Sequence, residues 1–424
     1  MTRQTNGGGL VVKHCRWRFS KSVVATVVIQ LLLGSVSAWA QDAPADPNAR
    51  EKAHLDISGF AMFDSGYDFN QNDPNWFDTM RPSKLPAFKD QFGKDGRFYA
   101  GVRQSRLGFN GYVPTPLGEL KTIFEFELFG TGVDAGQTTF RLRHAWGQLG
   151  RFGAGQYWTT FGDTDVYPNQ LEYWGPNGII WYRNVQFRFT AWEKGDSNLT
   201  IAAERPGASA DQGVYADRIE LQGVKPRNPM PDITGHFRLS GKGGHIQVAG
   251  LYRRIQWDDL NATPARDLSG HANGWGFNAS SHVNLSKHVL RLQAVYGHGV
   301  ENYMNDAPVD VGIQNNFSNA KTPILGKALP ALGLTAFLDL NWSKKFTSTI
   351  GYSRVDIDTT DGQSATAFKS GQYALTNILF YPVKNVMLGP EFQWGYRDNK
   401  KGWHVPDYRV QFSAKYNFNF KVGG

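Results

Sequence analysis

The stretch "YRVQFSAKYNFNF", Tyr408 to Phe420, alternates between two kinds of side chain from its first residue to its last. All of its even-numbered positions are apolar or aromatic, and all of its odd-numbered positions are polar or charged. Because successive side chains of a strand point to opposite faces of a sheet, this strand has one apolar and one polar face. The fold depends on which of these two faces meets water.

Sixteen stretches of the chain show this kind of pattern. The predicted strands span residues 54–66, 98–110, 118–130, 139–149, 151–159, 181–193, 198–206, 231–241, 245–257, 273–285, 288–299, 331–342, 346–357, 369–381, 385–397 and 407–420. Connections after even-numbered strands are short and rich in turn residues, as in "GKGG" and "PVKN". Connections after odd-numbered strands tend to be long, at 67–97, 160–180, 206–230, 258–272 and 300–330. Alternating short periplasmic turns and long extracellular loops are typical of outer-membrane barrels.

The number of strands decides which face meets water. About eight strands can fill a barrel with their own side chains, whereas about sixteen enclose an aqueous lumen. Apolar side chains cannot pack across such a lumen, so they must point outward into lipid. A strand of thirteen residues rises ~41 Å, or ~29 Å across a layer at ~45° tilt, enough for the ~25 Å apolar band of these barrels. The sequence therefore predicts an all-β fold, a transmembrane antiparallel β-barrel of about sixteen strands.

The alternative fold is a pair of secreted β-sandwich domains that would act as a soluble binding protein. Sandwich strands also alternate, but such domains rarely need sixteen strands of this length. The mean hydropathy is −0.43, aromatic residues make up 14% of the chain and glycines number 47. No run of 18 apolar residues follows the N-terminal region, which excludes a helical membrane protein.

The N-terminus predicts export. Residues 1–21 hold five basic residues and no acid, and "VVATVVIQLLLGSVSAWA" (23–40) then ends in a small-x-small triplet. This is the layout of a cleaved secretory signal peptide over residues 1–40, the alternative being a retained anchor helix. We expect a short periplasmic lead at 41–53 and the barrel at 54–424, in the outer membrane of a Gram-negative cell. Cleavage leaves 40 basic residues against 37 acids, so nucleic acid is not an expected partner, and it removes Cys15, the one cysteine.

If the apolar faces meet lipid, the polar faces line the lumen. Strand 139–149 then carries Phe140, Leu142 and Trp146 outward. The inward basic residues are Arg106, Arg141, Arg143, Arg188, Arg238 and Arg291, and strand 118–130 adds the inward acids Glu125 and Glu127. Guanidinium groups stay charged and bind carboxylates through two hydrogen bonds, so such a wall would concentrate small anions. The alternative is that these charges pair with luminal acids and only keep the channel wet. Arg103 falls on the apolar face, where a β-bulge or a subunit interface would explain it.

The connection 160–180, "TFGDTDVYPNQLEYWGPNGII", is rich in aromatic residues and contains Asp163, Asp165 and Glu172. We expect this third long connection to fold into the lumen and narrow it, with its acids opposite the arginines. The resulting transverse field would orient charged solutes. The alternative is an ordinary external loop.

The main functional alternative is an outer-membrane β-barrel enzyme, for example a phospholipase. Such an enzyme needs a nucleophile and a base within hydrogen-bond reach. His144 and His282 are candidate bases, but no G-x-S-x-G element accompanies them. No two histidines lie four residues apart and no cysteine remains after cleavage, so we expect neither a metal site nor a cofactor. The sequence predicts no catalytic residues.

Three stretches resemble the DcaP-like porin family of Gram-negative outer membranes: "RQSRLGFNG" (103–111), "FRLRHAWGQLGRFGAGQYWTTFGD" (140–163) and "WYRNVQFRF" (181–189). The resemblance covers about residues 55–195, and beyond them it rests on the strand pattern. It implies a homotrimeric channel, similar to general trimeric porins, that passes small anions such as dicarboxylates. It also implies that the family's signature arginines correspond to Arg106, Arg141, Arg143 and Arg188.

Two features depart from that family. Some members carry an N-terminal coiled coil, for which 41–53 is too short, and "KVGG" follows Phe420 where barrels usually end in an aromatic residue. The function expected from the sequence is passive diffusion of small hydrophilic solutes through an outer-membrane porin, with a preference for small anions. The expected partners are those solutes, membrane lipid and further copies of the chain.

Overall fold

Over residues 408–413 the apolar side chains are exposed and the polar side chains are buried, the reverse of a strand in a soluble protein. Tyr408 and Phe412 expose 42% and 45% of their surface, whereas Arg409 and Ser413 expose none. This inversion fits a strand whose apolar side chains face lipid. The computed structural model describes residues 52–216 and 223–423. The predicted signal peptide, with Cys15, and residues 41–51 of the predicted lead lie outside these described residues.

Within the described residues, sixteen strands close an antiparallel barrel when β18 and β19 count as one interrupted strand. They are β1 (His54–Asp68), β3 (Arg106–Thr115), β4 (Gly118–Phe129), β5 (Thr138–Leu149), β6 (Phe152–Trp158), β7 (Arg183–Lys194), β8 (Ser197–Glu204), β10 (Asp232–Gly241), β11 (Gly244–Asp259), β12 (Gly270–Leu285), β13 (His288–His298), β16 (Pro330–Asn341), β17 (Phe346–Ile357), β18 (Phe368–Asn377) with β19 (Leu379–Phe380), β20 (Val386–Asn399) and β21 (His404–Gly423). The barrel closes where β1 pairs with β21 from His54 opposite Gly423 to Asp68 opposite Arg409. The predicted fold is confirmed, and β21 stays paired through the "KVG" that follows Phe420.

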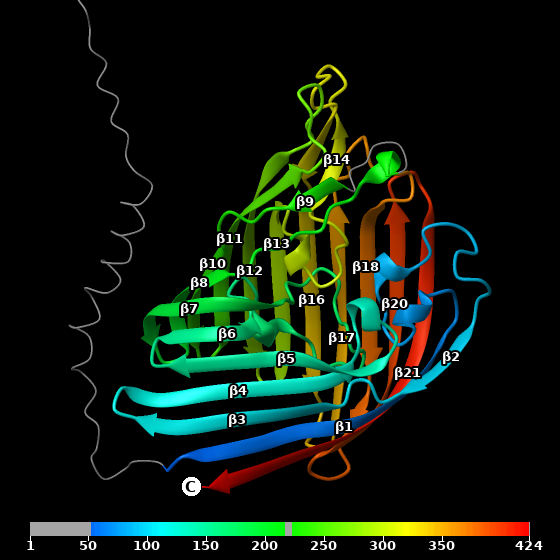
Figure 1. Ribbon diagram of the computed structural model, residues 1–424. Coiled ribbons are helices and arrows are strands. Elements are labelled where there is room, and N and C mark those ends of the chain that lie inside the picture. The colour runs from blue at the N-terminus through cyan, green and yellow to red at the C-terminus, as the bar shows by residue number, and fades with distance from the viewer. Residues whose placement is uncertain (1–51, 217–222, 424) are drawn as a thin grey trace, which may run out of the picture. The chain divides into compact units, whose positions relative to one another are not determined.

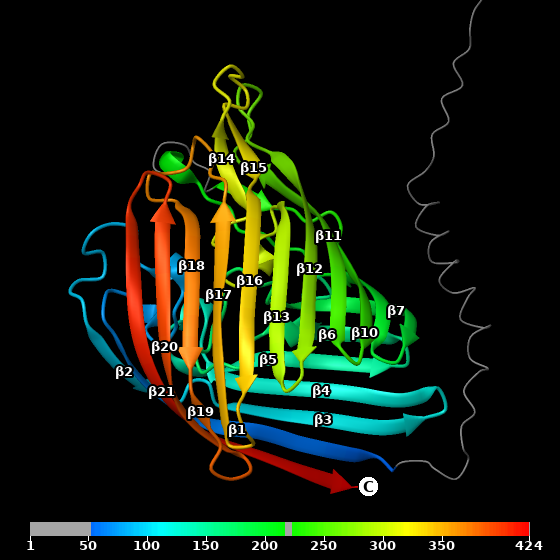
Figure 2. The same cartoon turned by 180° about the vertical axis from the view of Figure 1, so that it is seen from behind.

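Shorter elements lie at the loop end of the barrel. β2 (Arg97–Gly101) pairs with the end of β1, β9 (Val224–Pro226) pairs with the end of β11, and β14 (Val311–Asn315) and β15 (Ile324–Ala328) form a separate hairpin. The described helices are single 3-10 turns: η1 (Pro74–Trp76), η2 (Pro82–Lys84), η3 (Gly132–Asp134), η4 (Thr164–Val166), η5 (Gly213–Tyr215) and η7 (Glu301–Tyr303). No helix in the described ranges has the length and apolar character needed to cross a membrane. Figures 1 and 2 show β9, β14 and β15 at one end of the upright strands, with tight turns at the other end.

Arg103 lies in a turn and not on a strand. Residues 102–105 separate β2 from β3, so the predicted strand 98–110 is divided by a turn, and β3 continues to Thr115. The turn carries the Arg103 side chain inward, where its Nη1 lies 2.5 Å from Oδ1 of Asp78 and its Nη2 donates to the Gly130 carbonyl. The turn, rather than a subunit interface, takes this charge away from the lipid.

A β-bulge reverses the predicted orientation of Trp146. Glu125 of β4 lies opposite His144 of β5, and the pairing then skips Arg143, the extra residue. Residues of β5 after the bulge change face, so Trp146 is buried inside the barrel and its ring stacks on that of Tyr157 with centroids 5.4 Å apart. The prediction that Trp146 faces lipid is therefore wrong, because alternation along one strand does not reveal an extra residue.

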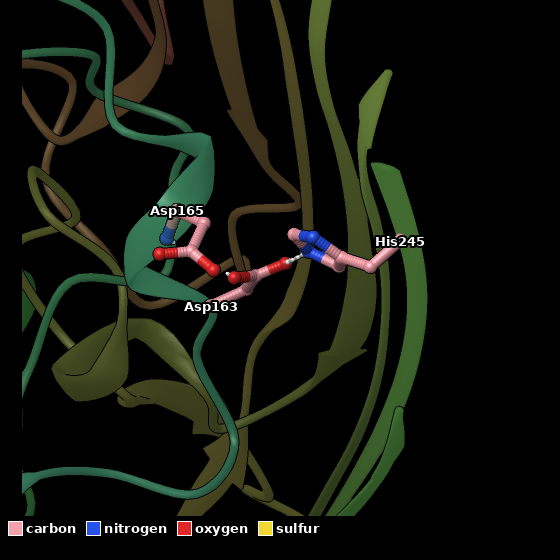
Figure 3. Close-up of side chains that lie close together, drawn as sticks. All are labelled: Asp163, Asp165 and His245. Atoms are coloured by element: carbon pink, nitrogen blue, oxygen red, sulfur yellow. Dashed lines mark hydrogen bonds and ion pairs between the residues drawn. The ribbon is translucent and has the colours of Figure 1, made fainter. Parts of the chain in front are cut away.

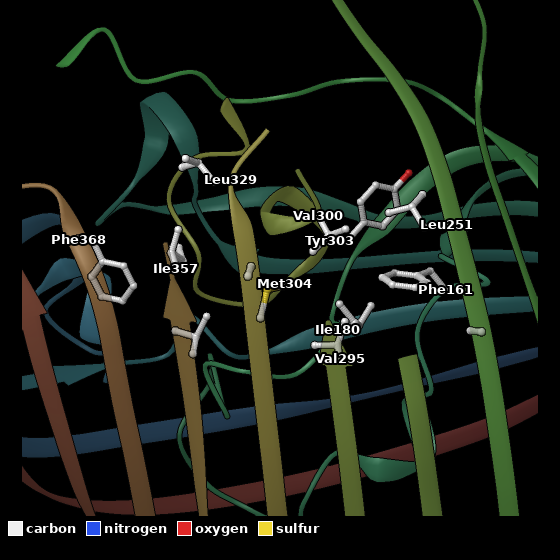
Figure 4. Close-up of a cluster of buried hydrophobic side chains, with 13 residues drawn as sticks. Phe161, Ile180, Leu251, Val295, Val300, Tyr303, Met304, Leu329, Ile357 and Phe368 are labelled. Atoms are coloured by element: carbon white, nitrogen blue, oxygen red, sulfur yellow. The ribbon is translucent and has the colours of Figure 1, made fainter. Parts of the chain in front are cut away.

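A cluster of buried apolar side chains covers the inner face of β11–β18 towards the loop end (Figure 4). The barrel strands and Leu329 contribute Ala249, Leu251, Val295, Ala331, Val355, Ile357, Phe368 and Leu329, and the loops contribute Phe161, Ile180, Val300, Tyr303 and Met304. The expectation that inward faces are polar is wrong in this region, since loops and not water cover the wall. The space open to solutes is therefore displaced to the other side of the barrel.

Candidate functional site

Three long connections meet inside the barrel: L1 (69–105, after β1), L3 (159–182, after β6) and L6 (299–329, after β13). L3 follows the inner wall for most of the circumference. Asp163 binds Ser280 of β12, Asn169 accepts from Thr349 of β17, the Leu171 amide donates to Glu391 of β20, and Tyr173 reaches β4. L3 therefore folds into the lumen, as predicted from its sequence, and narrows it.

L6 fastens L3 to L1. The indole of Trp174 in L3 donates to the carbonyl of Asn305 in L6 at 2.7 Å. The buried carboxylate of Asp306 in L6 accepts from Arg81 Nε at 2.9 Å and from the Ser83 amide at 2.8 Å, both in L1. The Arg81 guanidinium also lies over the Trp174 ring, 3.8 Å from its centroid. Hydrogen bonds, an ion pair and a cation–π contact thus hold the three loops together.

Removing the Asp306 carboxylate is expected to loosen L1 and widen the entrance. Asp306→Ala leaves Arg81 and the Ser83 amide without their buried acceptor, so L1 loses its attachment to L6. We expect a larger and noisier single-channel conductance in a planar bilayer. Asp95→Ala removes an exposed carboxylate from L1, the loop that Asp306 holds, and serves as the control. Equal conductance in both variants would contradict the role of Asp306.

A cavity of about 980 Å³ remains between L3 and the wall formed by β1, β3–β5 and β21. Its basic lining residues are Arg81, Arg106, Arg141, Arg143, Arg183 and Lys415, and its acidic ones are Glu125, Glu172 and Glu301. Aromatic side chains of β6 and L3, among them Trp158 and Trp181, form the facing side. The cavity therefore carries an excess of positive charge.

Glu127 is buried behind the arginines of this cavity and holds them in position. Its side chain has no exposed surface, and Arg143 Nη1 lies 2.5 Å from its Oε2. Arg141 donates to the other oxygen, Oε1, and the Tyr173 hydroxyl donates to the same atom at 2.5 Å. Arg143 also donates from Nε to Glu125 at 2.5 Å. These short, charge-assisted bonds engage Arg141 and Arg143 with protein acceptors.

Arg106 and Arg183 are held less tightly. Their guanidinium nitrogens lie 3.6 Å and 3.8 Å from Glu127 oxygens, which is ion-pair range but beyond hydrogen-bond length. Arg106 Nε and Arg183 Nη1 are buried and lack a hydrogen-bond partner. Unpaired charged donors beside an open cavity are suited to binding an anionic group. Ion pairs with Glu127 thus fix the positions of both arginines, while each keeps an N–H group that no atom of the described residues accepts.

The structure separates the six arginines predicted to form one wall. Arg106, Arg141 and Arg143 line the 980 Å³ cavity, whereas Arg188 and Arg238 line a second cavity of about 710 Å³ beside the turns of β7–β8 and β10–β11. Arg291 is paired with Asp339 of β16 at 2.7 Å. The cavities share lining only at Tyr157 and Trp158, among the described residues.

Three basic residues of the first cavity were not predicted from the sequence: Arg81, Arg183 and Lys415. Arg81 lies in L1, outside any strand, so strand alternation could not identify it. Arg183 precedes the regular alternation of its strand, which assigns even-numbered residues inward, so the pattern gave no signal. Lys415 lies on the polar face of the 408–420 stretch, and its Nζ sits 4.0 Å from the centroid of Phe60. That alternation contained the signal for Lys415.

The L3 acids Asp163 and Asp165 do not face the arginines of the first cavity. Asp163 accepts from His245 Nε2 at 2.7 Å (Figure 3). It also accepts from Ser280 at 2.7 Å, and Asp165 binds Arg238. Burial alone would raise the pKa of Asp163, but the hydrogen bonds from His245 and Ser280 hold that pKa below its usual range. The Arg238 guanidinium already supplies positive charge to this cluster. The two acids anchor L3 to β10–β12.

Glu172 is also an internal anchor. Its carboxylate accepts from the amides of Met80 in L1 and Trp174 in L3 at 3.1 Å and 2.9 Å. Burial raises the pKa of Glu172 to about 7, so the group is only partly ionised at neutral pH. The carboxylates closest to the arginines are therefore Glu125 and Glu127 in the wall itself, and the expected field between L3 acids and the wall is not seen.

Comparison with known proteins agrees with this architecture. The family model described as DcaP outer membrane protein matches residues 43–217. The outer membrane channel DcaP of Acinetobacter baumannii has a similar structure, with 20% identity, a TM-score of 0.71, and coverage of 87% of this chain and 99% of that one. An anion-selective porin from Comamonas acidovorans aligns with 10% identity and a TM-score of 0.54, covering 87% of this chain and 100% of the other. OmpT of Vibrio cholerae in its trimer form aligns with 12% identity and a TM-score of 0.50, covering 87% and 100%. No curated protein sequence matches the chain.

Proposed function

Because this outer-membrane β-barrel carries the DcaP outer membrane protein family match over residues 43–217, we infer that it is a porin with a preference for small anions such as carboxylates and dicarboxylates. Solutes cross it by diffusion, without a covalent step. The chain works as a homotrimer, in keeping with the trimer form of the similar OmpT. The resemblance noted in the sequence is borne out over the matched residues.

The observation that carries the proposal is the unequal pairing of the arginines around Glu127. Arg141 and Arg143 donate hydrogen bonds to Glu125, Glu127 and Tyr173, so their main contribution is to stabilise the wall of the cavity. Arg106 and Arg183 keep buried donors that no protein group accepts. Both residues line the cavity, so a carboxylate entering it would be attracted by two guanidinium groups that no group of the described residues binds at hydrogen-bond length, whereas a cation would be repelled. Selectivity is thus assigned to two arginines of the cluster.

The first test is the reversal potential of the purified protein in a planar bilayer under a salt gradient. We expect stepwise conductance with a reversal potential of the sign that indicates anion preference. Cation preference would contradict the proposed selectivity and leave the barrel assignment intact. Absence of channels from correctly folded protein would contradict the porin function itself.

The second test removes the two arginines that keep free donors. Arg106→Ala with Arg183→Ala is expected to reduce succinate flux into liposomes roughly tenfold or more, the effect of losing charge-assisted hydrogen bonds, while the flux of a neutral sugar of similar size stays within about twofold. Arg354→Ala removes one positive charge from the outer face of β17, away from the cavity, and is the control. Equal losses for succinate and sugar would mean that the arginines only shape the pore.

A further inference from the structure

We propose that Arg188 forms a second anion-binding site, separate from the Arg106–Arg183 pair, where the two cavities of the barrel meet. This proposal rests on the proposed anion-porin function and adds a second binding site along the path of the solute. Arg188 projects from β7 into the 710 Å³ cavity next to Tyr157 and Trp158, the two residues that line both cavities. A solute leaving the first cavity past Tyr157 meets Arg188 next.

The pairing of Arg188 differs from that of the other predicted luminal arginines. Among the described residues, Arg106, Arg141, Arg143, Arg238 and Arg291 each have a carboxylate within 4.0 Å, and Arg188 has none. Its hydrogen-bond partners are neutral: Nη2 donates to the Trp158 carbonyl at 2.5 Å, and Nε and Nη2 donate to Gln186 Oε1 at 3.2 Å and 3.0 Å. These bonds fix the position of the guanidinium without neutralising its charge.

Two aromatic rings hold the guanidinium from the sides. Its carbon lies 5.2 Å from the centroid of the Trp146 ring and 5.5 Å from that of Tyr157. The β-bulge in β5 places Trp146 in the lumen, and Gly153, opposite Arg188 on β6, leaves room for the indole, since a Cβ there would come within 2.0 Å of the ring. The bulge and Gly153 therefore place two aromatic rings where they stabilise the Arg188 guanidinium.

The acids of this cavity do not compete for Arg188. Asp163 and Asp165 are bound to His245 and Arg238. Glu193 and Asp196 are exposed and lie at the turn between β7 and β8, the exit of the cavity. Glu204, on the neighbouring strand, interacts with Arg188 electrostatically but from beyond ion-pair distance, and its carboxylate accepts from hydroxyls and an amide of threonines. An anion at Arg188 therefore has no internal carboxylate to displace.

The shape of the site defines the class of ligand. The remaining donor capacity of one guanidinium, with the hydroxyls of Thr190 and Thr200 lining the same cavity, suits a single carboxylate or an inorganic anion of similar size. A dicarboxylate would bind here by one end after its other end leaves the first cavity. The pore then holds anions at two places in series.

The experiment is block of chloride current by succinate, added in turn to each side of a planar bilayer holding one channel. For a single site, the fractions of the voltage drop that succinate crosses from the two sides sum to one. Two sites in series predict that they do not. Arg188→Ala is expected to weaken the block from the turn side roughly tenfold and to leave the block from the loop side within about twofold. Arg106→Ala is expected to give the reverse pattern, and Arg354→Ala to change neither.

Arg188→Lys and Arg188→Gln complete the series. Lysine keeps the charge without the planar fork, so we expect an intermediate loss of turn-side block, whereas glutamine should resemble alanine. Glutamine also keeps a long polar side chain at this position, so the site can still be tested if the alanine variant does not fold. Unchanged turn-side block in Arg188→Ala or Arg188→Gln would overturn the second site. A wild-type channel without anion preference would instead contradict the proposed function.

Discussion

Replacing Glu127 with leucine is expected to lower the free energy of unfolding by about 3–5 kcal/mol, the cost of leaving a buried charge without its partner. The Glu127 side chain is fully buried, and Arg141, Arg143, Arg106 and Arg183 all converge on it. Without this carboxylate, four guanidinium groups repel one another across a small volume. The measurement is urea-induced unfolding from lipid vesicles, followed by heat-modifiable gel migration.

Three further variants, Glu125→Gln, Glu127→Gln and Glu127→Gln with Arg141→Gln, separate the charge of Glu127 from its packing. Glu125→Gln removes a carboxylate that is partly exposed and pairs with Arg143 and Arg106, so its cost should be smaller. Glu127→Gln combined with Arg141→Gln removes one charge of each sign and should recover part of the stability that Glu127→Gln loses. If the double variant were less stable than Glu127→Gln alone, repulsion between arginines would not be the source of the effect.

Placing a charge on the lipid face of β21 is expected to destabilise the barrel by about 2–4 kcal/mol. Phe412→Arg puts a guanidinium near the middle of the apolar face, where hydrocarbon offers it neither water nor a partner. The effect is measured by folding into phosphatidylcholine vesicles across a urea series. A midpoint equal to that of the natural protein would contradict the lipid-facing orientation of this face.

The same strand provides matched controls. Phe412→Leu keeps an apolar side chain at the site and should change stability by less than about 1 kcal/mol. Asn417→Arg adds the same charge on the opposite face, where the side chain lines the 980 Å³ cavity and remains wet. The contrast between Phe412→Arg and Asn417→Arg separates the face of the strand from the chemistry of arginine.

The strands of this protein are predictable because their signal is local. Alternation over ten or more residues, as in 408–420, reports lipid on one side and polar surroundings on the other, and it needs no knowledge of distant residues. Errors occur where one residue breaks the period. The extra residue at Arg143 turns Trp146 inward, and the turn at 102–105 takes Arg103 out of the strand.

The site was harder to predict because it is made by contacts between distant segments. The sequence suggested that L3 enters the lumen, but its partners are spread from Glu127 to Glu391. Those contacts decide that Asp163 anchors a loop and that Arg188 lies in a different cavity from Arg106. Alternation identifies inward residues without showing which of them share a cavity, so the arginines were grouped as one wall.

The apolar cluster beneath the loops has a consequence for how the protein is assembled. On β11, β13, β16 and β17 the cluster adds inward apolar residues, such as Leu251 and Val295, to strands whose outward residues, such as Tyr252 and Tyr296, are already apolar or aromatic. Until L3 and L6 are seated, these strands would expose hydrophobic surface on both sides, one of them to water. Insertion of the wall and docking of the loops should therefore occur as one cooperative step, and truncating L6 should yield aggregated precursor rather than a wider channel.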